Sequence, residues 1–71
     1  MATNVEAHIT GTVWKIEKQA GDEVEEGDII LILESMKMEM PVESPDDGVV
    51  AEIKVAEGEA VDEGQVVAVL E

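Results

Sequence analysis

Short apolar runs alternate with polar, glycine-containing segments along the chain. Residues 29–33 read Ile-Ile-Leu-Ile-Leu and residues 66–70 read Val-Val-Ala-Val-Leu. Both runs are rich in β-branched side chains, which favour strands. Residues 13–16, 38–43 and 49–55 are further strand candidates. Because no segment keeps a helical period for the roughly 10 to 12 residues that a helix needs, the pattern predicts about eight short strands in an all-β fold.

The sequence repeats itself after 37 positions without a gap. This shift pairs all six glycines, as Gly11 with Gly48, Gly21 with Gly58, and Gly27 with Gly64. Glycines at shared offsets indicate shared backbone demands, because glycine adopts positive φ at little cost. The two units span residues 5–34 and 42–71. We therefore predict one domain over residues 1–71, a flattened barrel or sandwich (a barrel-sandwich hybrid) of two four-stranded antiparallel sheets with pseudo-two-fold symmetry.

Residues 35–41, Ser-Met-Lys-Met-Glu-Met-Pro, lie between the two units. The flanking strands are close enough in sequence to form a hairpin with its tip near Met36 and Lys37. Tight hairpin turns favour Asn-Gly or Asp-Gly because their central residues need positive φ, so methionine and lysine are ill-suited here. An ill-suited residue at such a place suggests another purpose for it. A solvated lysine beside gap-filling methionines would nevertheless give the same pattern.

Composition narrows the possible functions. The chain has 4 Lys+Arg against 18 Asp+Glu, and this net charge of −14 argues against binding to nucleic acid or to an anionic membrane. It has no cysteine and one histidine, so we expect no metal site of the thiolate or histidine-cluster kind. No apolar run approaches the roughly 20 residues that span a bilayer, and the N-terminus lacks a signal-peptide pattern. We expect a cytoplasmic protein.

Three further features receive structural interpretations. The acidic segment 22–28 is expected to be a solvated turn, because a calcium-binding loop starting at Asp22 would need an oxygen ligand in place of Val24. His8 has no partner for a catalytic triad and is expected in a surface turn. Trp14, the only aromatic residue, is expected to pack in the core or at its rim.

Residues 34–38, Glu-Ser-Met-Lys-Met, resemble the attachment motif of biotinyl domains, the modules of biotin carboxyl carrier proteins. In that family the usual form is Glu-Ala-Met-Lys-Met, and the lysine receives biotin. The resemblance implies that Lys37 carries biotin covalently, and that a biotin protein ligase recognises Glu34, Ser35, Met36 and Met38. Ser35 replaces the usual alanine, which is a small-for-small change.

The resemblance covers residues 5–71, including the duplicated glycine framework. His-Ile at residues 8–9 stands where the family often has Pro-Met. The connection at residues 18–22 has no room for the thumb loop that closes over biotin in some carriers. The chain therefore resembles the thumbless small form, with a more freely exposed biotin.

The resemblance also implies a non-catalytic role in a biotin-dependent carboxylase. An exposed lysine amine is protonated at neutral pH and is a poor nucleophile, so attachment needs the ligase. Biotin carboxylase would then load the carrier and a carboxyltransferase would unload it, with an acyl-CoA as the expected acceptor.

Two other functions stay open. A lipoyl carrier has a similar fold but usually presents its lysine within Asp-Lys-Ala, and a dual biotin/lipoyl attachment protein would accept lipoate as well. More distant is an unmodified β-sandwich that serves as an interaction domain.

Overall fold

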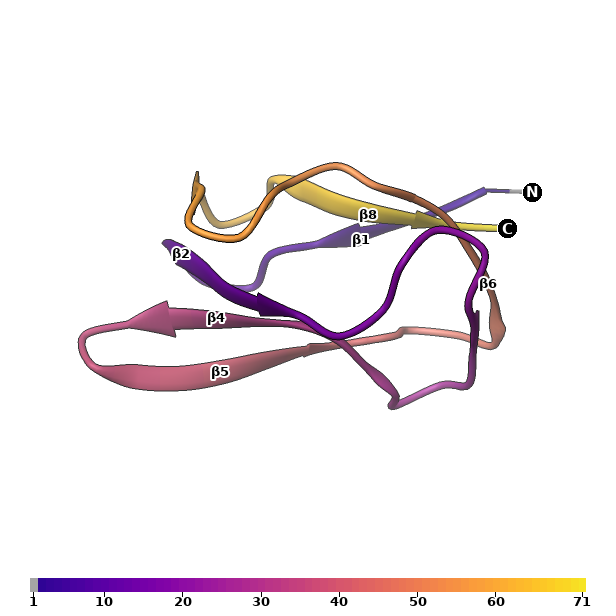
Figure 1. Cartoon of the computed structure of the whole chain (residues 1–71), viewed down its shortest axis with the longest axis horizontal. Coiled ribbons are helices and arrows are strands. Elements are labelled where there is room, and N and C mark those ends of the chain that lie inside the picture. Colours follow the sequence, from indigo (N-terminus) through magenta and orange to yellow (C-terminus); the bar gives the residue numbers. More distant parts are fainter. Residues whose placement is uncertain (1) are drawn as a thin grey trace.

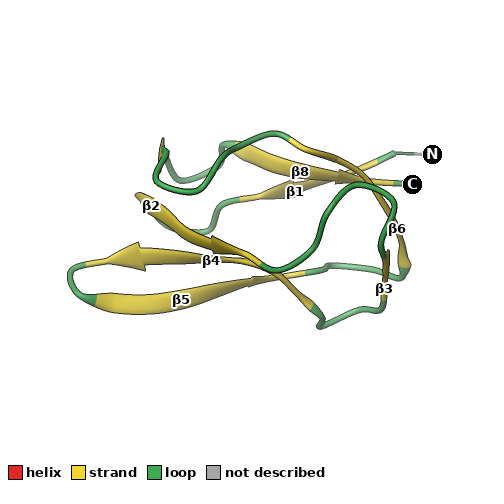
Figure 2. Ribbon diagram, viewed as in Figure 1, coloured by secondary structure: helices red, strands yellow, loops and turns green. Residues whose placement is uncertain are grey.

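A computed structural model describes residues 2–71 and shows eight strands (Figure 1). Their bounds are β1 (Thr3–Glu6), β2 (Gly11–Ile16), β3 (Glu23–Val24), β4 (Ile29–Ser35), β5 (Met38–Glu43), β6 (Gly48–Ile53), β7 (Ala60–Val61) and β8 (Val66–Leu70). Loops and turns make up the rest of the described chain (Figure 2). Within residues 2–71 there is thus no helix that could span a membrane. The prediction of about eight short strands is confirmed.

The strands form two four-stranded antiparallel sheets, in the orders β1-β8-β6-β3 and β5-β4-β2-β7. The 37-residue repeat maps one sheet onto the other, strand by strand, since β1 corresponds to β5, β8 to β4, β6 to β2 and β3 to β7. Each sheet therefore takes two strands from each copy. The predicted fold class is confirmed, and the pseudo-two-fold axis relates the two sheets.

The repeated glycines are needed for two different reasons, positive φ in turns and close approach of two strands. The prediction of positive φ holds for the four turn glycines, Gly21, Gly27, Gly58 and Gly64, whose φ angles are 98°, 91°, 90° and 88°. It is wrong for Gly11 and Gly48, which begin β2 and β6 and approach another strand's backbone too closely for a side chain.

Side-chain oxygens, three from carboxylates and one from an amide, close the turns around the glycines. In the first copy Asp22 Oδ2 accepts a hydrogen bond from the Gln19 N–H, and Asp28 Oδ2 accepts one from the Glu25 N–H, both at 2.8 Å. In the second copy Glu59 and Gln65 accept equivalent bonds from the N–H groups of Ala56 and Asp62, both at 3.1 Å. Part of the acidic segment 22–28 therefore has a structural role as turn acceptors.

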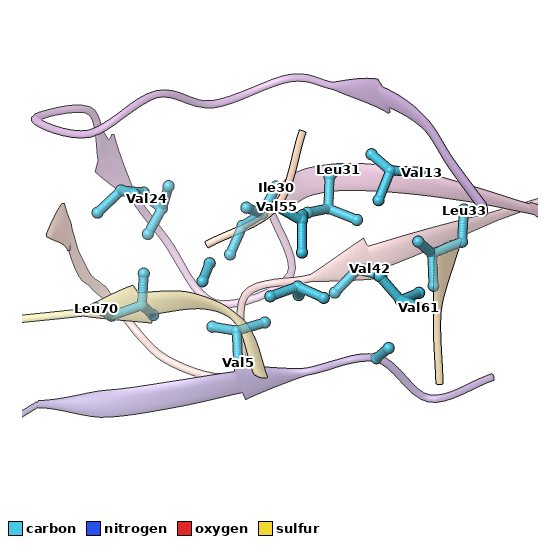
Figure 3. Packing of buried hydrophobic residues seen from close by; sticks show 14 residues of the cluster. Val5, Val13, Val24, Ile30, Leu31, Leu33, Val42, Val55, Val61 and Leu70 are labelled. Carbon is cyan, nitrogen blue, oxygen red and sulfur yellow. The ribbon is translucent and has the colours of Figure 1, made fainter. Parts of the chain in front are cut away.

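A single apolar cluster fills the space between the sheets (Figure 3). Its largest fully buried side chains are Ile30, Leu31, Leu33, Leu70, Val13, Val50, Val61 and Val67. Val55 also belongs to the cluster although β6 ends at Ile53. The predicted strand 49–55 was therefore two residues too long, because the buried Val55 lies in the connection after β6.

Trp14 was expected in the core or at its rim, and with 46% of its surface exposed it lies outside the core. Val13 before it is buried, so strand alternation turns Trp14 outward. A β-bulge in β2 falls at the same place. Val13 pairs with Leu33 and Lys15 with Ile32, which leaves Trp14 as the extra residue without a partner. The repeat has the same irregularity at Ala51, between Val50 and Glu52.

Candidate functional site

The longest strand pair of the fold ends in the Met36–Lys37 turn. Strands β4 and β5 pair from Ile29 with Glu43 to Ser35 with Met38, so the turn holds two residues. The predicted hairpin and the position of its tip are confirmed. The φ angles of Met36 and Lys37 are 51° and 66°. Both central residues thus have the positive φ that a two-residue hairpin turn requires.

This turn carries backbone strain. Met36 and Lys37 are the only non-glycine residues with positive φ among residues 2–71. For a side chain other than glycine, that conformation costs roughly 1–2 kcal/mol per residue. The long β4–β5 register imposes it, whereas Asn-Gly would adopt it at lower cost. A strained position held by its surroundings is a candidate functional site.

The Lys37 side chain is exposed at one extreme of the molecule. The turn lies at one end of the longest dimension, 33 Å, while the start of β1 and the end of β8 lie towards the other end (Figure 1). The ion pairs formed within residues 2–71 join Lys15 to Glu17 and Lys54 to Glu52, and neither involves Lys37. The Lys37 side chain therefore faces solvent.

The other predicted site residues surround this amine. Met36 and Met38 have 92% and 61% of their surfaces exposed, although methionine is among the residue types most often buried. Glu34 is exposed and pairs with Glu39, while Ser35 is half-buried in the last row of the hairpin. The five predicted residues 34–38 thus form one continuous end of the hairpin.

Two further residues reach this end of the molecule and were not predicted as site residues. A hollow of about 170 Å³, which we call the hairpin groove, is lined by Ile9, Ser35, Met36, Met38 and Met40. Alternation along β5 could have indicated Met40, because residues two apart share a face of a strand. Ile9 comes from the β1–β2 connection, and nothing in its local sequence places it beside the hairpin.

The chemistry available at this end is that of the amine. Within the described residues no three acidic or histidine side chains converge to hold a metal ion. A lysine amine on an exposed, rigid turn can form a covalent bond with a carbonyl carbon. The site therefore fits a covalently attached group.

Comparisons with known proteins agree with this geometry. The model of the biotin/lipoyl family, described as "Biotin-requiring enzyme", matches residues 1–70. Among curated relatives, the biotinylated protein TB7.3 of Mycobacterium tuberculosis is 45% identical over 42 residues, which is 59% of this chain and 59% of that protein. The biotin/lipoyl attachment protein of Bacillus subtilis is 47% identical over 38 residues, 54% of this chain and 52% of that protein. The matched segments thus span little more than half of these relatives.

Solved structures extend the likeness to nearly the whole fold. The crystal structure of the Kluyveromyces lactis urea carboxylase matches with a TM-score of 0.95 at 38% identity, over 100% of this chain and 6% of that chain. A single-chain, multi-domain long-chain acyl-CoA carboxylase matches with a TM-score of 0.88 at 26% identity, over 96% of this chain and 7% of that chain. In both cases the matching part is a small portion of a much longer chain.

Proposed function

Because the chain belongs to the biotin/lipoyl family and is a biotinyl domain, we propose that it carries biotin on Lys37 within a biotin-dependent carboxylase. The observation that carries this proposal is the strained turn. Lys37 has a φ of 66° where glycine would be preferred, and it is exposed between two exposed methionines.

Attachment is an acyl transfer to the lysine. In the proposed reaction, a biotin protein ligase joins the biotin carboxylate to the α-phosphate of ATP, which gives biotinyl-adenylate and releases pyrophosphate. The Lys37 Nζ loses a proton, attacks the acyl carbon and displaces AMP, which leaves an amide bond. The exposed Met36 and Met38, with Glu34 and Ser35 beside them, form the surface that the ligase would contact. The chain supplies position, and the ligase supplies the activated acyl group.

The loaded domain would act as a carrier and not as a catalyst. When bound, biotin supplies a site for a transferable carboxyl group, which biotin carboxylase adds and a carboxyltransferase removes. The lysine side chain with its biotin extends about 14 Å from the backbone, at about a dozen bonds. A mobile arm on a rigid hairpin can thus serve two partner enzymes in turn.

We propose an acyl-CoA as the carboxyl acceptor, with urea as the alternative. The likeness to a long-chain acyl-CoA carboxylase supports the first, and the likeness to a urea carboxylase supports the second. Reconstitution with the partner subunits of each class and labelled bicarbonate separates them, because only the matching acceptor will become labelled.

The proposal is tested by modification of the intact chain. After incubation with biotin, ATP and a biotin protein ligase, mass spectrometry should show one biotinyl group, which peptide mapping should locate on Lys37. The Lys37→Arg variant should remain unmodified, while Lys15→Arg should be modified as the parent is. Faster uptake of lipoate from a lipoate ligase would instead identify a lipoyl carrier, and the absence of either adduct would reject the carrier function.

A further inference from the structure

The hairpin groove lies directly beside the proposed attachment site. Ile9, Met38 and Met40 contribute its apolar side chains, and Ser35 and Met36 complete the lining. Building on the proposed function, we propose that the biotinyl arm of Lys37 folds back and rests its apolar part in this groove. The groove would then shelter biotin in a chain that has no thumb loop.

The groove exists because the hairpin extends past the core. Along the face of β4 and β5 that meets the core, Leu31 pairs with Val42, and both are buried. The next row pairs the buried Leu33 with the half-buried Met40, and the last pairs Ser35 with Met38, which is 61% exposed. The inner face thus continues as an apolar surface with no strand opposite it, and Figure 1 shows the hairpin projecting beyond the body.

The internal repeat shows that the fold itself does not require an apolar surface there. Ile9 corresponds to Asp46, 37 positions later, and Met40 corresponds to Thr3, 37 positions earlier. These counterparts occupy equivalent places on equivalent strands and connections. The two copies share their glycines and turn acceptors. The apolar Ile9 and Met40, in place of polar counterparts, are therefore specific to the end that carries Lys37.

The groove suits the arm in size and in reach. Its volume of about 170 Å³ is enclosed partly by Met36 and Met38, the two neighbours of Lys37 in sequence. An arm of up to about 14 Å can turn back over these neighbours. Its methylene chain and thioether ring are apolar, and methionine side chains adapt well to such shapes. Burial of this apolar surface would favour the folded-back state.

The first test compares the intact chain before and after biotinylation by methyl NMR. Mass spectrometry must first show a single adduct on Lys37; if none forms, the proposed function fails and the groove is not at issue. With the adduct present, the methyl signals of Ile9 and Met40 should shift and show nuclear Overhauser effects to the biotin ring. Shifts confined to residues 35–38, with no such contact at Ile9 or Met40, would overturn the proposal.

The second test opens the groove. Ile9→Ser and Met40→Thr should each remove contacts with biotin and raise the rate of avidin binding to the biotinylated chain severalfold. Ile29→Ser is the matched control, since Ile29 is 39% exposed on β4 at the end distant from Lys37, and it should leave that rate unchanged. Thermal unfolding of each variant verifies that the fold is kept.

A ligase-docking role for the groove would give a different pattern. In that case Ile9→Ser would slow the biotinylation reaction, while avidin binding and the biotin contacts of the finished product would stay as in the parent. That outcome would overturn the folded-back arm, although biotin on Lys37 would still stand.

Discussion

Gly11 packs against the backbone of Glu34, so closely that a methyl group on Gly11 would lie 2.7 Å from the Glu34 carbonyl oxygen. It would also lie 3.4 Å from the Cβ of Ser35. Gly11 begins β2, and its neighbour Thr12 pairs with Glu34. This contact therefore holds the start of β2 against the end of β4, two residues before the turn that presents Lys37.

The Gly11→Ala variant should be less stable and should be biotinylated more slowly. A methyl group at 2.7 Å from a backbone oxygen forces β2 and β4 apart, and overpacking of this kind costs roughly 1–3 kcal/mol. The displaced end of β4 also carries the turn. Urea unfolding measures the first effect, and the initial rate of biotinylation by a ligase measures the second.

Gly48→Ala provides the control for this variant. The repeat places Gly48 against Glu71, and a methyl group there would lie 2.9 Å from the Glu71 carbonyl oxygen. The stability loss should be comparable, but this contact lies at the end of the molecule distant from Lys37. Biotinylation by the ligase should therefore stay at the parent rate. Equal slowing in both variants would show that general destabilisation, and not the position of the hairpin end, controls modification.

Lys37→Gly should stabilise the protein while abolishing modification. Lys37 has a φ of 66°, and glycine relieves that conformation while adding freedom to the unfolded chain, for a net gain of roughly 0.5–1 kcal/mol. Lys15→Gly is the matched control, because Lys15 lies within β2 and glycine there should cost roughly 0.5–1 kcal/mol. Chemical denaturation compares the two. If Lys37→Gly loses as much stability as Lys15→Gly, the turn is not strained.

The sequence was sufficient to predict the fold and the tip of the hairpin because both depend on local backbone chemistry. The glycine spacing revealed the repeat, and the repeat isolated Met36 and Lys37 as ill-suited turn residues, which their φ angles of 51° and 66° confirm. The strands were predicted because their apolar runs are short and β-branched.

What the sequence could not show depends on contacts between distant segments. The bulge at Trp14 depends on the register between β2 and β4. The close approach of Gly11 to Glu34 likewise joins residues of two different strands, so a glycine needed for space was interpreted as one needed for positive φ. Ile9 joins the hairpin groove only through the packing of the β1–β2 connection.

Exchanging the two turn residues, as Met36→Lys with Lys37→Met, should reduce the efficiency of biotinylation at least about tenfold, since misplacement by about 1 Å can cost a hundredfold. Both positions lie in the turn. The exchange therefore moves the Cα atom that carries the amine by about 3.8 Å and leaves the amino-acid composition unchanged. The ligase kcat/KM for biotinylation measures the effect. An unchanged value would show that the ligase recognises the local sequence regardless of the amine's place in the turn.

Added salt should stabilise this protein, because its charges are mostly of one sign. The net charge is −14, and the ion pairs formed by residues 2–71, Lys15 with Glu17 and Lys54 with Glu52, lie on exposed side chains. Repulsion among the carboxylates opposes the compact state. Since the screening length falls from about 30 Å at 0.01 M salt to about 3 Å at 1 M, the melting temperature should rise steadily over that range of sodium chloride.

A charge-reduced variant separates screening from the general effect of salt on apolar burial. Four of the exposed glutamates whose side chains form no hydrogen bond within the described structure are suitable sites: Glu6, Glu23, Glu43 and Glu63. Changing these four to glutamine brings the net charge from −14 to −10. The variant should melt at a higher temperature than the parent in low salt, and the difference should shrink as salt is added. Parallel melting curves at all salt concentrations would show that salt acts on apolar burial and that carboxylate repulsion contributes little.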